Sequence, residues 1–161
     1  MSALQHAFWD EACAQVLADA SLLAAMTRFE AGLARASAQA GIVPESAAKT
    51  IGEVASRATF DAIGLARAAR RASTLAIPFV KRLTEQVAAV SPEAARFVHF
   101  GATSQDVVDT GVVLCLVPAA ERVLELSRRL GDAAVVLAMR HARAPMAART
   151  LLQPAVPVPF G

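Results

Sequence analysis

The sequence has few aromatic residues. Its 161 residues include one tryptophan and no tyrosine, and aromatic residues make up 5% of the chain. Proteins that bind single-stranded nucleic acid usually place aromatic side chains among basic ones, and no such interleaving occurs here. The one basic cluster contains Arg67, Arg70 and Arg71. We interpret this cluster as a solvated helix end and expect no nucleic acid as a partner.

Cysteine is scarce, and neither sign of charge dominates. Cys13 and Cys115 are isolated, without the Cys-x-x-Cys spacing or the histidine pattern of a metal site, so we expect reduced thiols and no bound metal. The net charge is +2, from 16 basic and 14 acidic residues. No apolar run reaches the roughly 18 residues that span a bilayer. The N-terminus shows no basic region followed by a hydrophobic one. The expectation is a cytoplasmic protein with no membrane segment and no signal peptide.

Apolar residues recur at helical spacing along most of the chain, which predicts an all-α fold. A first helix is expected with Asp19 or Ser21 as its cap and Gly41 at its end. Further helices are predicted for residues 44–58, 60–71 and 73–89, followed by a short turn from residue 91. The apolar face of the first helix is expected to contain Leu22, Met26, Phe29 and Leu33.

A much longer helix is predicted from Gln105 to Arg140. Its length would be roughly 50 Å at 1.5 Å per residue, with a kink or a restart at Pro118. Four prolines after Ala144 preclude regular helix there, although a short extended pair within residues 146–158 is possible. Such alanine-rich helices carry wide apolar faces that need a covering partner, so we expect an oligomer of open stoichiometry.

Residues 99–110, His-Phe-Gly-Ala-Thr-Ser-Gln-Asp-Val-Val-Asp-Thr, lead into this long helix. Thr103 precedes Asp106 by three residues, which is the spacing of a capping box with aspartate in place of glutamate. Hydroxyls and unpaired N–H groups at the positive end of a helix favour anion binding. Taken alone, this spacing would better fit an ordinary N-cap beside a buried histidine, His99.

The whole segment resembles the first signature region of the fumarase/aspartase superfamily, and within it the 3-carboxy-cis,cis-muconate cycloisomerases, with the pattern H-x-G-A-T-S-Q-D-x-x-D-T. Residues 149–161 are similar to the second signature region, R-T-x-x-Q-x-A-x-P-x-T-F-G. Residues 29–36, Phe-Glu-Ala-Gly-Leu-Ala-Arg-Ala, resemble an early helix of the family with the pattern F-E-x-x-L-A-x-A. Residues 41–44 and 76–80 resemble two further family segments, so the resemblance covers nearly the whole chain.

The resemblance implies the N-terminal helical domain of that fold in residues 1–103 and the start of a long-helix central domain in residues 104–161. Family members are two to three times longer, and their third signature, S-S-x-x-M-P-x-K-x-N, is missing from this sequence. We therefore interpret the chain as a fragment that is inactive by itself. A natural short paralogue and a shortened form of a longer protein both remain open.

The implied activity is lactonisation of 3-carboxy-cis,cis-muconate, in the protocatechuate branch of aromatic degradation, without metal or organic cofactor. The implied substrate is a small polycarboxylate, and the whole family assembles as homotetramers. His99 is the candidate catalytic residue. The Arg70 region falls near the active-site rim of the family, which gives it a possible steering role. The candidate substrate-binding residues are Thr103, Ser104, Gln105, Asp106, Arg149, Thr150 and Gln153.

One departure bears on the choice within the superfamily. Adenylosuccinate lyases, argininosuccinate lyases and fumarases carry histidine after the threonine of the second region, whereas this chain has Leu151. An apolar residue there favours the cycloisomerases. Many of those have histidine after the glutamine, however, where this chain has Pro154, so the identity of the general acid stays open. Two alternatives remain, an adenylosuccinate lyase-like enzyme and a noncatalytic helical oligomer or binding module.

Overall fold

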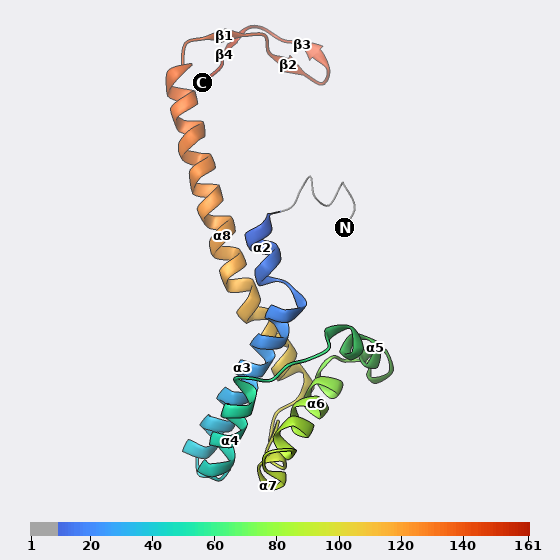
Figure 1. Cartoon of the computed structure of the whole chain (residues 1–161). Helices are drawn as coiled ribbons and strands as arrows, with labels where there is room; N and C mark the ends of the chain where they lie inside the picture. Colours follow the sequence, from blue (N-terminus) through green and yellow to red (C-terminus); the bar gives the residue numbers. More distant parts are fainter. Residues whose placement is uncertain (1–9) are drawn as a thin grey trace. The chain divides into compact units, whose positions relative to one another are not determined.

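The computed structural model describes residues 10–161, and it is built of helices followed by four very short strands (Figure 1). Its residues divide into two units, Met1–Ala119 and Ala120–Gly161. The predicted all-α fold class is confirmed. The prediction about a signal peptide concerns residues 1–9, which lie outside the described part. The helices of the first unit are α2 (Glu11–Val16), α3 (Asp19–Gln39), α4 (Glu45–Ala55), α5 (Ala62–Ala72), α6 (Ala76–Ala88), α7 (Pro92–Ala95) and the first part of α8 (Ser104–Arg140).

The start of α3 differs from the sequence-based expectation, whereas its end agrees with it. The residue before the helix is Ala18, which makes no side-chain cap, so neither predicted cap is correct. Asp19 instead lies in the first turn, where its charge suits the helix dipole. The Ser21 hydroxyl donates to the carbonyl oxygen of Gln15 at 2.6 Å. Gly41 follows the helix with φ +71°, the left-handed conformation that glycine adopts without strain.

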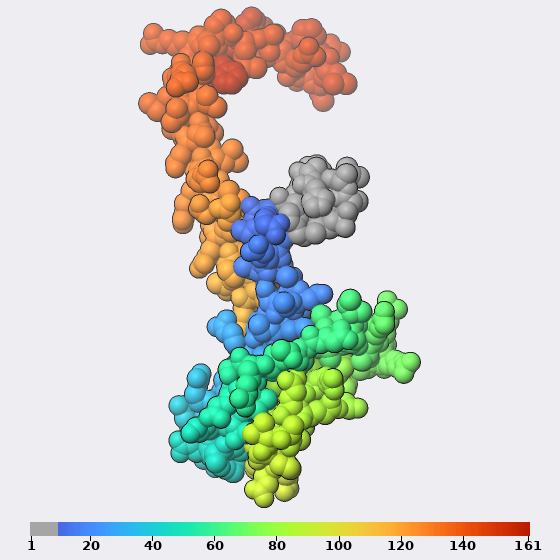
Figure 2. Space-filling view, viewed as in Figure 1, coloured from blue at the N-terminus to red at the C-terminus, as the bar shows by residue number. Residues whose placement is uncertain are grey.

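In the core of the first unit, α4 packs against α3, α6 and α7, and Figure 2 shows α4 against the α6–α7 segment. Full burial of a large apolar side chain in this core contributes roughly 1.5–3 kcal/mol to the stability of the fold. The buried face of α3 is rotated from the predicted one, because Leu22, Phe29 and Leu33 are only half-buried whereas Leu23 and Glu30 are buried. The largest fully buried side chains are those of Phe79, Met26, Ile51, Leu83, Glu30, Val87 and Val107.

The long helix α8 forms as predicted and continues through Pro118 without a restart. It approaches α3 closely at Gly111, where an added Cβ would lie 2.8 Å from Met26 Cγ and 3.3 Å from Leu22 Cδ1. The predicted domain boundary after residue 103 coincides with the start of this helix. The two structural units divide later, after Ala119 and within α8. The boundary at residue 103 therefore stays a prediction.

In the second unit, the remainder of α8 is followed by two short antiparallel pairs. β1 (Pro145–Met146) pairs with β4 (Val158–Pro159), and β2 (Arg149–Thr150) pairs with β3 (Gln153–Pro154), which confirms the extended pair expected in this region. Within residues 10–161, no helix has the length and apolarity that crossing a membrane would require. The exposed apolar residues of α8 in this unit are Val123, Leu124, Leu126, Leu130, Val135, Val136, Leu137 and Met139.

Gly111 should tolerate no larger residue. Alanine is favoured over glycine inside a helix by about 1 kcal/mol, but overpacking a core costs about 1–3 kcal/mol. We expect Gly111→Ala to destabilise the chain, because the fully buried Met26 has little room to move. Gly131→Ala is the matched control in the same helix, since nothing lies within 4 Å of its added Cβ, and it should stabilise. Urea unfolding followed by circular dichroism measures both, and equal shifts would contradict the close packing.

Candidate functional site

The loop between α7 and α8 carries the candidate catalytic histidine in an unusual backbone conformation. His99 has φ +58° and Gly101 has φ +76°, so two left-handed residues flank Phe100 and turn the chain into α8. Glycine adopts this conformation freely, but for histidine it costs of the order of 1–2 kcal/mol. A residue held in this way needs compensating contacts, and at His99 they come from α3.

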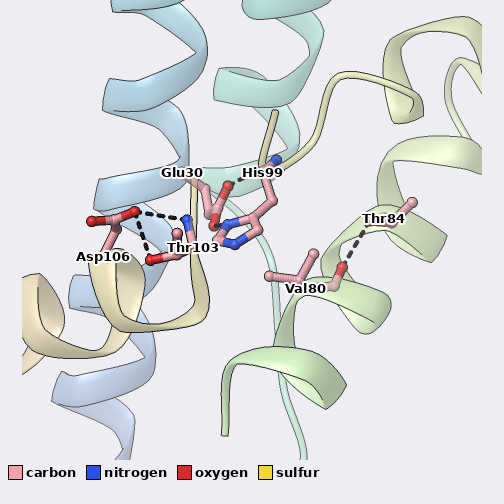
Figure 3. A network of polar contacts seen from close by, with 6 residues as sticks. All are labelled: Glu30, Val80, Thr84, His99, Thr103 and Asp106. Atoms are coloured by element: carbon pink, nitrogen blue, oxygen red, sulfur yellow. Dashed lines mark hydrogen bonds and ion pairs between the residues drawn. The ribbon is translucent and has the colours of Figure 1, made fainter. Parts of the chain in front are cut away.

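Glu30 reaches from α3 and makes two contacts with His99 (Figure 3). One carboxylate oxygen, Oε2, accepts the backbone N–H of His99 at 3.1 Å. The other, Oε1, lies 2.6 Å from the ring Nδ1. Glu30 is only 1% exposed, and this burial raises the pKa of its carboxyl group even though both His99 contacts favour the charged form.

Glu30 was not among the site residues predicted from the sequence. A signal was available, however, because the buried residues of α3 include Leu23, Met26, Thr27, Glu30 and Ala34, which recur at helical spacing. An acidic residue inside such a face needs a partner, since an unpaired buried charge is costly. The sequence does not show which distant residue that partner is.

At the start of α8, Asp106 turns back toward Thr103 (Figure 3). Its Oδ2 accepts the Thr103 backbone N–H at 2.7 Å, which is one half of the predicted capping box. In the other half, the threonine hydroxyl would accept an N–H, but here it donates to the same Oδ2 at 2.9 Å. These two bonds, led by the backbone one, lower the pKa of the Asp106 carboxyl group, and the nearby His99 contributes in the same direction.

Several donors at the same helix end stay unused within residues 10–161. The backbone N–H groups of Ser104, Gln105 and Asp106 have no protein acceptor there, and neither does the Ser104 hydroxyl. Such groups can bind an anion, assisted by the helix dipole. The Asp106 carboxylate at this end opposes that attraction. The structure thus brings His99 and the 103–106 residues of the sequence prediction into one local arrangement.

The other three candidates lie in the second unit, on the β2–β3 hairpin. Thr150 pairs with Gln153 and Arg149 with Pro154. The turn between the strands consists of Leu151 and Leu152, both with positive φ and both almost fully exposed. Within the described residues Arg149 forms no ion pair, so its guanidinium group is available to a ligand. None of the described residues forms a group of three or more His, Cys, Asp or Glu placed to hold a metal ion.

Comparison with known proteins identifies the family. A family model described as Lyase matches residues 2–161. The chain belongs to this lyase family. Over 144 residues, the chain is 49% identical to the 3-carboxy-cis,cis-muconate cycloisomerase of Bradyrhizobium diazoefficiens, a match that covers 89% of the chain and 32% of the relative. Over 145 residues, it is 45% identical to the nitrosuccinate lyase of Streptomyces davaonensis, covering 90% of the chain and 31% of the relative.

A solved structure agrees with these matches. The β-carboxy-cis,cis-muconate cycloisomerase from Acinetobacter calcoaceticus sp. ADP1 matches with a TM-score of 0.90 and 36% identity, covering 98% of this chain and 37% of the other. The chain thus spans about a third of the length of the relatives it matches. The resemblance inferred from the two signature regions, to the cycloisomerases within the lyase superfamily, is confirmed.

The Asp106 carboxyl group should titrate below the ordinary value of 3.8. Its contribution to stability is then fully present above pH 3.8 and is lost as the pH falls through the lower, folded-state value. Thr103→Val removes the hydroxyl donor and should move the midpoint back upward. Carbon-detected NMR titration of the carboxyl group measures the midpoint. Ser104→Ala is the control, because Ser104 makes no bond to Asp106; an equal effect of both substitutions would contradict the assignment.

Proposed function

We propose that this chain forms the N-terminal part of a cofactor-independent enzyme that lactonises 3-carboxy-cis,cis-muconate. One observation carries the proposal. The unused donors at the start of α8 lie in the same local arrangement as a firmly held histidine, His99, in a chain 49% identical to a protein with that name. The segment would contribute carboxylate binding and a histidine ring to a site completed by other parts of the enzyme.

The reaction explains why such donors are needed. In the ring closure, a carboxylate oxygen adds to one carbon of a double bond, and the electron pair of that bond moves to the adjacent carbon. Negative charge is then shared with the neighbouring carboxylate group until the adjacent carbon accepts a proton. The enzyme must therefore hold a tricarboxylate and stabilise additional charge as it develops. Fixed N–H donors at a helix end can do both, because they require no reorganisation during the reaction.

Within the 103–106 segment, the structure supports different roles for the two hydroxyl residues. The Thr103 hydroxyl already donates to Asp106, so Thr103 would organise the start of the helix. Ser104 has an unused hydroxyl and is the better candidate for direct contact with a substrate carboxylate. Gln105 is exposed and can add an amide donor. Asp106, as an anion, would hold the helix end in shape rather than contact the substrate.

Arg149, Thr150 and Gln153 would supply a second group of donors. All three are exposed on the β2–β3 hairpin, and arginine can bind a carboxylate through two parallel hydrogen bonds. His99 is the candidate proton-handling residue of the described part, since its ring is held on one side only.

We further propose that the enzyme is a cytoplasmic homo-oligomer. Association is expected because the second part of α8 exposes a long series of apolar side chains that it would cover.

A second activity within the family has comparable support. The identity to the Streptomyces nitrosuccinate lyase is 45%, close to the 49% for the Bradyrhizobium cycloisomerase. Both names describe substrates with more than one acidic group, which fits the same donors. The choice between them needs an activity measurement.

A chimera tests the function. The matched segment of the Bradyrhizobium cycloisomerase would be replaced by this chain, and the loss of ultraviolet absorbance of 3-carboxy-cis,cis-muconate would be followed. We expect lactonisation, with kcat/KM lowered about ten- to a hundredfold by Ser104→Ala, as a lost hydrogen bond to a charged group implies. Thr84→Val is the matched control, because the Thr84 hydroxyl donates to Val80 of its own helix (Figure 3).

The reciprocal chimera, made in the Streptomyces nitrosuccinate lyase, separates the two activities. A folded cycloisomerase chimera without activity, together with an active nitrosuccinate lyase chimera, would show that the proposed substrate is wrong. Activity in both would show that the substrate is chosen outside this segment.

The chain by itself should bind a tricarboxylate weakly and turn over none. An exposed helix-end contact contributes roughly 0.3–1 kcal/mol, and the serine- and lysine-bearing signature is absent from the sequence. Titrating a tricarboxylate into isotope-labelled chain should shift the amide signals of residues 103–106, and Ser104→Ala should weaken these shifts. Shifts centred on residues 67–71 would place the anion site at the basic cluster instead, and turnover would show that the missing signature is dispensable.

A further inference from the structure

Glu30 is a buried titratable residue that the proposed reaction does not use. It lies on α3, 69 positions before His99 in the sequence, and its side chain has no exposed surface. Burying a carboxyl group is costly unless hydrogen bonds compensate, and both of its oxygens contact His99. A residue that only filled space at this position would be apolar, as its buried neighbours Leu23, Met26 and Ala34 are.

The two contacts between Glu30 and His99 have different effects. The bond from the backbone N–H to Oε2 holds His99 in its left-handed conformation and so fixes the loop. The bond between Nδ1 and Oε1 acts on the ring. A carboxylate can only accept, so Nδ1 must carry a proton when Glu30 is ionised. In the neutral ring the other nitrogen, Nε2, is then an acceptor.

Nε2 is the ring nitrogen that remains for a ligand. Within the described residues it makes no hydrogen bond, and it is not enclosed, since the His99 side chain is 16% exposed. Figure 3 shows the ring beside Thr103, at the start of α8. Two charged groups interact with the ring, Glu30 and Asp106, and Asp106 is already bonded to Thr103.

We propose that Glu30 is a positioning residue for His99, which keeps the proton of the neutral ring on Nδ1 and presents Nε2 as the nitrogen that faces the substrate. This inference rests on the proposed function in one respect, namely that His99 acts on the substrate. The geometric part, the Nδ1–H form of the ring, stands independently of any activity.

The tautomer of His99 is directly measurable. Long-range proton–nitrogen correlation spectra of the labelled full chain at neutral pH distinguish Nδ1–H from Nε2–H. We expect the Nδ1–H form for His99. His141 is an internal control, because it lies in the second unit, where its ring packs edge-on against Phe160 at a centroid distance of 5.6 Å. An Nε2–H form of His99 in the unaltered chain would overturn the proposal, whether or not any variant folds.

Glu30→Gln gives a sharper test, since glutamine has nearly the same shape. Its oxygen can still accept the His99 backbone N–H, but its amide must then donate to Nδ1, which moves the ring proton to Nε2. We expect this reversal at His99 with no change at His141. Asp106→Asn should leave the His99 tautomer as it is. An unchanged Nδ1–H form in a folded Glu30→Gln variant would show that Glu30 does not set the tautomer.

The chimera with the Bradyrhizobium enzyme separates the two proposals. If His99 handles a proton, Glu30→Gln should lower kcat about ten- to a hundredfold and leave KM within about twofold, because substrate donors are untouched. An active chimera whose kcat is unaffected by Glu30→Gln would contradict the positioning role while supporting the function. An inactive chimera together with the Nδ1–H form would contradict the function while keeping the geometric assignment.

Discussion

The contact between Glu30 and His99 joins the two parts of the first unit that matter most to the candidate site. It connects the middle of α3 to the loop that precedes α8, through one bond to the backbone and one to the ring. The loop then turns through Gly101 into the first turn of α8, where Thr103 and Asp106 are bonded to each other. Without the carboxylate, a histidine in a left-handed conformation would lose the contact that offsets its cost.

Close packing of α3 against α8 also helps to hold the Glu30–His99 contact in place. Gly111 of α8 lies against Met26 of α3, which comes one helical turn before Glu30. Because Gly111 has no side chain, α3 can approach α8 closely at this point. The polar contact and the apolar one thus lie one helical turn apart on α3. The Glu30 carboxylate stays paired only if α3 keeps its distance from the chain that leads into α8. The buried Met26 side chain, which cannot easily move, maintains that distance.

The sequence predicted the helical class, the length of α8 and the cluster at its start, because helical periodicity and signature residues are local properties. The rest depends on contacts between distant residues. The α3 face was assigned one position out of phase, since alanine-rich helices give a weak amphipathic signal and Leu23 was passed over for Leu22. Glu30 was overlooked because its partner follows 69 residues later. Likewise, the spacing of Thr103 and Asp106 indicated a cap but not that the hydroxyl would donate.

The single helix α8 lies in two different environments. In the first unit its buried residues, Val107, Gly111, Cys115 and Ala119, recur every four positions, so tertiary packing stabilises that part. From Ala120 to Arg140 nearly every side chain is exposed, and Arg122 pairs with Glu125 at 2.8 Å. An exposed segment of that kind behaves like an isolated peptide helix, whose helicity is marginal and falls with temperature. Amide protons should therefore exchange slowly before Ala119 and quickly after it, so that one continuous helix contains two levels of local stability.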